Sequence, residues 1–130
     1  MAVTWKQYSG VWTMQSQMQA VSAGTWTGFP YLWSWGYNFY GQLGLGNITY
    51  YSSPKQVGAL TNWLSVSCGY QHTVSVKTDG TLWSWGKNDY GQLGQGNTTN
   101  YSSPKQVGAL TFWTKLFKGC TTYSTIAISS

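Results

Sequence analysis

The side chains that most often carry catalytic chemistry are scarce in this 130-residue sequence. It contains only two acids, Asp79 and Asp89, and one histidine, His72. A Ser-His-Asp triad, a pair of catalytic carboxylates or a metal site needs more such groups than the sequence offers. Asp79 falls in a Thr-Asp-Gly turn signal, where we expect a structural role. The sequence therefore predicts a protein that is not an enzyme and that holds neither a cofactor nor a metal.

Cys68 and Cys120 are the only cysteines, and no Cys-x-x-Cys spacing or histidine pairing accompanies them. Isolated cysteines are among the most buried residues in proteins, so we expect two buried free thiols. A disulfide between them is the alternative, because sequence alone does not assign the pairing of cysteines.

Composition narrows the class of protein. Only 7% of the residues are charged, 18% are aromatic, 16 are glycine, and glutamate is absent. This favours short strands joined by tight turns. The net charge of +5 comes from seven scattered lysines with no arginine, which argues against a nucleic-acid surface. No apolar run approaches the roughly 20 residues of a membrane span, and the N-terminus lacks a signal-peptide pattern. We expect no membrane insertion, and a location in a virion or outside the cell, otherwise in the cytoplasm during production.

A tandem repeat dominates the chain. Residues 32–63 return as residues 82–113, a shift of 50, with 26 of 32 positions identical. This organisation predicts an N-terminal segment, 1–31, and a repeat region, 32–130, divided into repeats 32–81 and 82–130. Four short strands per repeat are typical of a β-propeller blade, so we expect an all-β fold with two blades per chain. The expected strands are 32–36, 54–57, 64–67 and 73–77, and in the second repeat 82–86, 104–107, 114–117 and 125–129.

The repeat also matches a known motif, W-x-W-G-x-N-x-x-G-Q-L-G-x-G followed by S-P-x-x-V and G-x-x-H-T-x-x-x-x-x-D-G. In these residues the sequence resembles the regulator-of-chromosome-condensation repeat. The second copy keeps the motif through Val107 and Gly119 but lacks the His-Thr pair and the last Asp-Gly. The resemblance implies a propeller, usually of seven blades, in which His72 packs and hydrogen-bonds within a blade. The matching residues are Trp35, Gly36, Asn38, Gly41, Gln42, Leu43, Gly44, Gly46, Pro54, Val57, Gly69, His72, Thr73, Asp79 and Gly80.

Candidate binding residues lie in the connection between the first and second strands. Five of the six differences between residues 32–63 and 82–113 fall there, at positions 37, 39, 45, 48 and 50. A constant frame with one variable loop is typical of a binding scaffold, and aromatic side chains suit sugars or protein pockets equally. Random drift and aromatic cover for a blade edge are the alternative explanation. The candidates are Tyr37, Phe39, Tyr40, Tyr50, Tyr51, Lys87, Asp89, Tyr90, Asn100 and Tyr101.

The N-terminal segment is not part of the repeat. Its apolar residues follow a helical 3-4-3 spacing, which predicts a short helix that needs a partner surface. Residues 9–26 resemble a short segment of phage virion proteins, although the expected proline is displaced to Pro30. The resemblance implies attachment to another virion protein; a plain linker helix packed on the propeller is the alternative. The candidate anchor residues are Val11, Trp12, Met14, Met18 and Val21.

The two ends of the repeat region predict self-association. We expect strand 73–77 to pair with strand 82–86 across the Thr-Asp-Gly turn. Strand 32–36 then has no partner before it, and strand 125–129 has none after it. Exposed strand edges invite pairing, and a head-to-tail contact between copies closes a ring. Three copies would supply six blades and four copies eight. We expect a homotrimer, because many viral fibres are trimeric and three N-terminal helices could bundle, with a tetramer as second choice. The expected closure residues are Leu32, Trp33, Trp35, Thr125, Ile126 and Ile128.

These observations predict a non-catalytic binding or structural module. The favoured function is a phage virion appendage, such as a tail fibre, tail tip or capsid-attached propeller, that presents its loops to a cell-surface carbohydrate or protein. The alternative is a protein-binding or enzyme-inhibiting propeller that is a fragment of a longer repeat protein. The family that the repeat resembles also includes a nucleotide-exchange factor, but nothing in this sequence matches the insertions which that activity needs.

Overall fold

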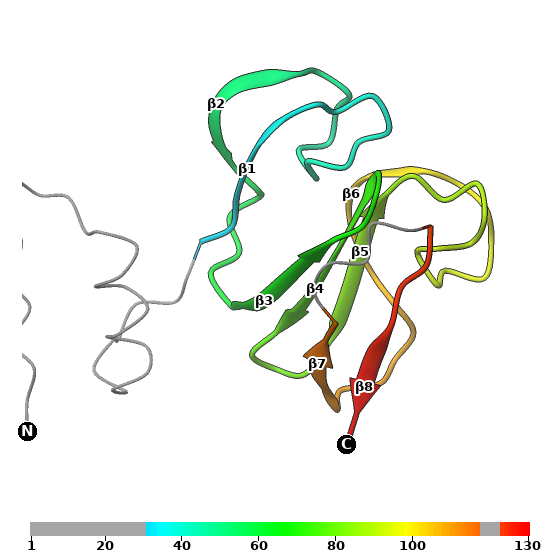
Figure 1. Cartoon of the computed structure of the whole chain (residues 1–130). Coiled ribbons are helices and arrows are strands. Elements are labelled where there is room, and N and C mark those ends of the chain that lie inside the picture. The colour runs from blue at the N-terminus through cyan, green and yellow to red at the C-terminus, as the bar shows by residue number, and fades with distance from the viewer. Residues whose placement is uncertain (1–30, 118–122) are drawn as a thin grey trace, which may run out of the picture.

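The computed structural model describes residues 31–117 and 123–130, which form an all-β structure (Figure 1). All eight predicted strands are present in the predicted order, while the predicted N-terminal helix lies outside the described residues. Within the described part of the chain, no helix is long and apolar enough to span a membrane. The strands are β1 (Trp33–Gly36), β2 (Tyr51–Gln56), β3 (Trp63–Cys68), β4 (His72–Lys77), β5 (Leu82–Gly86), β6 (Tyr101–Gln106), β7 (Trp113–Leu116) and β8 (Ala127–Ser129).

The strands form three antiparallel sheets, with the orders β1-β2, β3-β4-β5-β6 and β7-β8. The four-stranded sheet takes two strands from each repeat, so the structural blade is offset from the sequence repeat. β4 and β5 pair with His72 opposite Gly86 and Val76 opposite Leu82, which confirms the predicted pairing across the Thr-Asp-Gly turn. The described residues thus contain one complete blade between two half-blades (Figure 1), and the predicted propeller architecture is confirmed.

The second strand of each repeat begins earlier than the sequence indicated. β2 starts at Tyr51 and β6 at Tyr101, three residues before the prolines at which we expected these strands to begin. Proline has no N–H to donate to a ladder and is confined to edge strands. Both strands lie at an edge of their sheet in the described structure, so Pro54 and Pro104 interrupt no second ladder.

The apolar core lies mainly between sheets. Val74, Val76 and Leu82 of the complete blade are buried against side chains of the half-blade β7-β8. On the other side, Trp85 of β5 is only 1% exposed. Its indole N–H donates to the carbonyl oxygen of Gln42 in the first repeat, at 2.9 Å. Successive blades are therefore held together by contacts between residues that are far apart in the sequence.

The expectation of a buried thiol is wrong for Cys68, which is a free, exposed cysteine at the end of β3. β3 is an edge strand of the complete blade, and Cys68 lines a groove between this blade and β1. No described residue fills that groove, so the thiol stays open to solvent. Cys120 lies outside the described residues.

Candidate binding surface

The connection between the first and second strands of each repeat is held by one buried asparagine. The Asn88 side chain is fully buried, and its Nδ2 donates to the carbonyl oxygens of Asn97 and Thr99 at 2.9 and 3.0 Å. Its Oδ1 accepts the backbone N–H of Leu93 at 2.9 Å. Asn38 is equally buried and makes the same three bonds with the residues fifty positions earlier. The frame of the two loops is thus fixed while the side chains around it vary.

The first loop carries a cluster of aromatic rings on its outer side. The ring of Tyr37 lies 5.0 Å from that of Tyr50 and 6.5 Å from that of Phe39, measured between centroids. Phe39 in turn meets Tyr40 edge-on at 4.9 Å. Tyr37, Phe39 and Tyr50 are all more than half exposed, so the cluster covers little of the core and faces solvent.

Lys87 connects this cluster with a second group of rings. Its ammonium lies 4.6 Å from the centroid of the Tyr40 ring and 5.7 Å from that of Tyr123. Tyr123 contacts Tyr70 and Tyr90, with centroid distances of 5.4 and 5.1 Å. The ammonium also forms an ion pair with Asp89 at 3.4 Å. Partial desolvation alone would lower the pKa of Lys87, but Tyr40 and Asp89 outweigh it and raise the pKa, so this group is a cation at neutral pH.

These side chains form one continuous patch, which we call the aromatic surface. Seven of the ten predicted binding residues belong to it, and the sequence missed two members, Tyr70 and Tyr123. Both lie between the third and fourth strands of a repeat. Because β4 runs antiparallel to β5, this connection lies at the same end of the blade as the loop that follows β5. The aromatic surface consists of Tyr37, Phe39, Tyr40, Tyr50, Tyr70, Lys87, Asp89, Tyr90 and Tyr123.

The other three predicted residues make contacts inside their own loops. The Tyr51 hydroxyl accepts from the Asn47 side chain at 3.2 Å. The Tyr101 hydroxyl accepts from Asn97 at 3.1 Å and from Lys105 at 3.2 Å. Asn100 Oδ1 accepts the backbone N–H of Asn88 at 2.7 Å. These side chains fasten the loop where it enters the second strand, so we leave them out of the aromatic surface.

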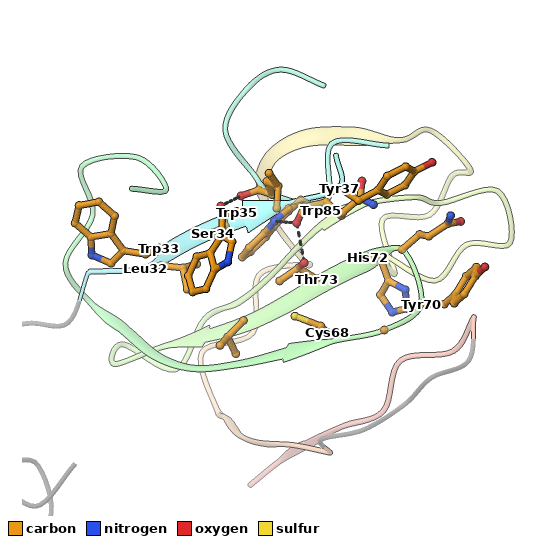
Figure 2. Close-up of a pocket in the computed structure, with 15 residues that line it drawn as sticks. Leu32, Trp33, Ser34, Trp35, Tyr37, Cys68, Tyr70, His72, Thr73 and Trp85 are labelled. Atoms are coloured by element: carbon orange, nitrogen blue, oxygen red, sulfur yellow. Dashed lines mark hydrogen bonds between the residues drawn. The ribbon is translucent and has the colours of Figure 1, made fainter. Parts of the chain in front are cut away.

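A groove of about 340 Å³ lies between β1 and the complete blade (Figure 2). Leu32, Trp33 and Trp35 line it, and Trp35 is 57% exposed. Figure 2 shows Tyr37 and Tyr70 together at one end of the groove, so it opens onto the aromatic surface. The remaining predicted closure residues lie at the opposite side of the described chain. There Thr125 lines a second groove of about 440 Å³, while Ile126 and Ile128 are exposed.

Two stretches of the chain, residues 31–76 and 79–123, match the family model described as the regulator of chromosome condensation (RCC1) repeat. The chain belongs to the RCC1 repeat family. A second RCC1 repeat model matches residues 63–92, which include the junction between the two repeats. The resemblance predicted from the repeat motif is thereby confirmed.

Solved RCC1-type structures show the same fold. Human WBSCR16 is 26% identical, with a TM-score of 0.55, over 62% of this chain and 21% of its own. Prp20p from Saccharomyces cerevisiae, described with its binding to Gsp1p and histones, is 27% identical, with a TM-score of 0.54, over 61% of this chain and 20% of its own. Yeast RCC1 (Prp20) bound to Kap60, at 21% identity, shares the fold, with a TM-score of 0.53 over 82% of this chain and 26% of its own. The chain thus spans about a fifth to a quarter of these proteins.

The histidine of the first RCC1 repeat joins two blades, whereas we expected it to bond within one. His72 is 3% exposed, and its Nε2 lies 2.9 Å from the Thr125 hydroxyl, which precedes β8 in the next half-blade. That hydroxyl donates to the carbonyl oxygen of Gln92 at 2.8 Å. Burial lowers the pKa of His72, so the imidazole is neutral at physiological pH. Among the described residues, no three acidic, histidine or cysteine side chains come together as a metal site.

Replacement of His72 by alanine should lower the free energy of unfolding by about 1–3 kcal/mol and reduce its pH dependence. Because the folded-state pKa is lowered, the wild-type imidazole contributes fully above the unfolded value of about 6.5, and this contribution falls as the pH drops below it. Urea denaturation at pH 7.5 and 5.5 measures the difference. Wild type should lose more stability across this interval than the His72→Ala variant.

The matched control is Asp79→Asn. The Asp79 carboxylate accepts the hydroxyl and the backbone N–H of Thr81, at 2.6 and 3.0 Å, and these bonds lower its pKa. Its contribution is therefore lost only below about pH 4, outside the interval tested. Asp79→Asn should keep the wild-type difference between pH 7.5 and 5.5. Equal differences in wild type and His72→Ala would show that His72 does not titrate as argued.

Proposed function

We propose that this chain is a non-catalytic, protein-binding module of the RCC1 type, and that the aromatic surface is its contact site. The observation that carries the proposal is the continuous patch of seven aromatic rings with one lysine. Tyrosine supplies large, rigid contact area and is enriched among the residues that dominate protein–protein binding energy. A patch that extends over both loops and the β3–β4 turn is wider than one sugar ring, which favours a protein partner over a carbohydrate.

The absence of catalysis is part of this proposal. The histidine and both carboxylates of the chain are engaged in structural contacts. His72 bonds to Thr125, Asp79 caps its turn through Thr81, and Asp89 pairs with Lys87. The binding of Gsp1p and histones described for yeast Prp20p supports a protein partner for an RCC1-type propeller. Since this chain spans only a fifth of that protein, the identity of the partner does not carry over.

The aromatic surface should lose its partner when two rings of its first-loop cluster are removed. Peptides selected from a phage-displayed library on the immobilised chain should bind wild type and lose at least about 30-fold in affinity on Tyr37→Ala/Phe39→Ala, as hot-spot residues do. Isothermal titration with synthetic peptides measures this. The control Tyr51→Phe, outside the surface, should bind like wild type. A glycan array that binds the chain while no peptide does would replace the protein partner by a carbohydrate.

A virion appendage with a location in a virion or outside the cell is a second proposal. It rests on the resemblance of residues 9–26 to a segment of phage virion proteins, and these residues lie outside the described structure. The two proposals share the propeller and its aromatic surface. They differ in whether the first 31 residues attach the propeller to a larger assembly.

A further inference from the structure

The contact between the two repeats inside the chain shows which groups meet where one RCC1 repeat packs against the next. Gln42 is its centre, because its carbonyl oxygen accepts both the Trp85 indole N–H at 2.9 Å and the Thr73 hydroxyl at 2.8 Å. The Trp85 ring covers Gly44, where an added Cβ would lie 2.7 Å from Nε1. Ser102 of β6 covers Gly41 in the same way and accepts the backbone N–H of Gly46 at 2.8 Å. The following repeat thus inserts a tryptophan and a serine onto the Gln-Leu-Gly turn of the preceding repeat.

The same groups recur at the two outer sides of the described chain, but there they do not meet. Trp35, the counterpart of Trp85, is 57% exposed at the groove beside β1. At the far side, the Gln92 carbonyl accepts the Thr125 hydroxyl at 2.8 Å, as Gln42 accepts Thr73, and it lacks a tryptophan donor within the described residues. Gly91 is open where its counterpart Gly41 is covered by Ser102. One side of the chain therefore carries the inserting tryptophan and the other carries the turn that receives it.

The backbone at these two sides is complementary as well. In β4 the N–H of Lys77 donates to the Thr81 carbonyl, so the backbone groups of every second residue counted from Lys77 point toward β5. The His72 carbonyl accepts the N–H of Gly69, so the backbone groups of the residues in between point toward β3. The β7–β8 register repeats the β3–β4 register with Ala127 in the place of Ser75. The N–H and carbonyl of Ala127 in β8 therefore point away from β7. In the β4–β5 register Ser75 lies opposite Trp83, and the counterpart of Trp83 in β1 is Trp33.

We propose that a second copy of this chain occupies these edges, with β8 of one copy paired to β1 of the next in the register of β4 and β5. In this contact Trp35 of the next copy inserts beside Gln92 and Gly94, and its indole N–H donates to the Gln92 carbonyl. Half-blade β7-β8 and half-blade β1-β2 then complete one four-stranded blade. Three copies give six complete blades, the homotrimer expected from the sequence, and four copies give eight.

The occupant is a second copy because this chain carries both halves of the contact. The receiving turn, Gln-Leu-Gly, occurs at residues 42–44 and 92–94 and is absent from residues 1–30, so the N-terminal segment does not supply it. The residues that would be covered are also those left open in one copy. Trp33 is 50% exposed, Ile128 is 42% exposed, and the exposed Cys68 lies in the groove beside β1.

The oligomeric state of the full chain tests this inference. Size exclusion with light scattering should give about three times the 14.5 kDa mass of one chain. The Trp35→Ala variant should weaken self-association at least about 30-fold, since a buried tryptophan anchor is lost, while its circular dichroism spectrum stays that of a β protein. The control Ile48→Ala removes another exposed apolar side chain, 61% exposed, and should associate like wild type. A folded monomer at all concentrations overturns the proposal; a tetramer supports the contact and corrects the count.

Cross-linking tests the register independently of Trp35. Leu32 and Ile128 are the counterparts of Leu82 and Val76. In the β4–β5 ladder Leu82 and Val76 lie opposite one another as a non-hydrogen-bonded pair. Such pairs have Cα atoms about 4.5 Å apart, within disulfide range. Leu32→Cys/Ile128→Cys, in a background with Cys68→Ser and Cys120→Ser, should form covalent oligomers on oxidation. The control Leu32→Cys/Ile126→Cys is shifted by two residues, about 7–8 Å away, and should cross-link poorly. Equal cross-linking of both, or intramolecular cross-linking only, contradicts this register.

Discussion

Trp85→Ala should lower the free energy of unfolding by about 3–5 kcal/mol, the cost of emptying a large buried aromatic site. Trp85 is 1% exposed, and its ring centroid lies 5.7 Å from that of Trp63. Its indole N–H also bonds to Gln42 in the preceding repeat. A domain of ordinary stability has only about 5–15 kcal/mol in total, so the variant should be largely unfolded in mild urea.

Urea denaturation followed by far-UV circular dichroism measures the loss, at equal protein concentration for all variants. Phe39→Ala is the control, because Phe39 is 54% exposed and belongs to the aromatic surface. Its change in stability should stay within about 0.5 kcal/mol. An equal denaturation midpoint for Trp85→Ala and wild type would show that the blades are not joined through this tryptophan.

The repeat motif predicted the strands because its glycines and prolines mark turns at fixed spacings. The Thr-Asp-Gly turn signal at residues 78–80 also placed β4 beside β5 correctly. Strand ends were less accurate where a proline was involved, because whether Pro54 is tolerated depends on the edge position of β2 and not on its neighbours in the sequence. Local signals therefore sufficed for the elements, and the position in the sheet decided their limits.

The environments of equivalent residues could not be predicted, because they depend on which blade lies beside each one. Trp35 and Trp85 stand in the same five-residue strand sequence, yet one is 57% exposed and the other 1%. His72 finds its partner 53 residues away in Thr125, so the bond leaves no pattern in the local sequence. A motif that repeats along the chain specifies what a residue is able to contact, while the neighbouring blade decides whether it does.

The aromatic surface was predicted in part for a similar reason. Tyr37, Phe39 and Tyr50 were found because they differ between two otherwise identical loops. Tyr70 and Tyr123 lie in less similar segments, where differences between the repeats carry no signal. Only the antiparallel arrangement of β4 and β5 shows that the turn before β4 ends beside the loop that follows β5.

Asn88→Leu should lower the free energy of unfolding by about 3 kcal/mol, because three backbone groups each lose a hydrogen bond of about 1 kcal/mol to this buried side chain. The carbonyl oxygens of Asn97 and Thr99 and the N–H of Leu93 all bond to this one side chain. Leucine has a similar size but neither donates nor accepts, so packing is retained while the hydrogen bonds are not.

The equivalent substitution in the first repeat separates contacts within a repeat from contacts between repeats. Asn38 bonds only to residues of its own loop, as Asn88 does, so Asn38→Leu should cost about as much as Asn88→Leu. The two equivalent tryptophans should differ in this respect. In a dilute, unassociated chain Trp35 is exposed, so Trp85→Ala should lower the free energy of unfolding and Trp35→Ala should not. Thr98→Ala, an exposed change in the same loop as Asn88, is the control and should stay within about 0.5 kcal/mol of wild type. If Asn88→Leu also stays within that range in urea denaturation, the loop frame does not depend on its buried asparagine.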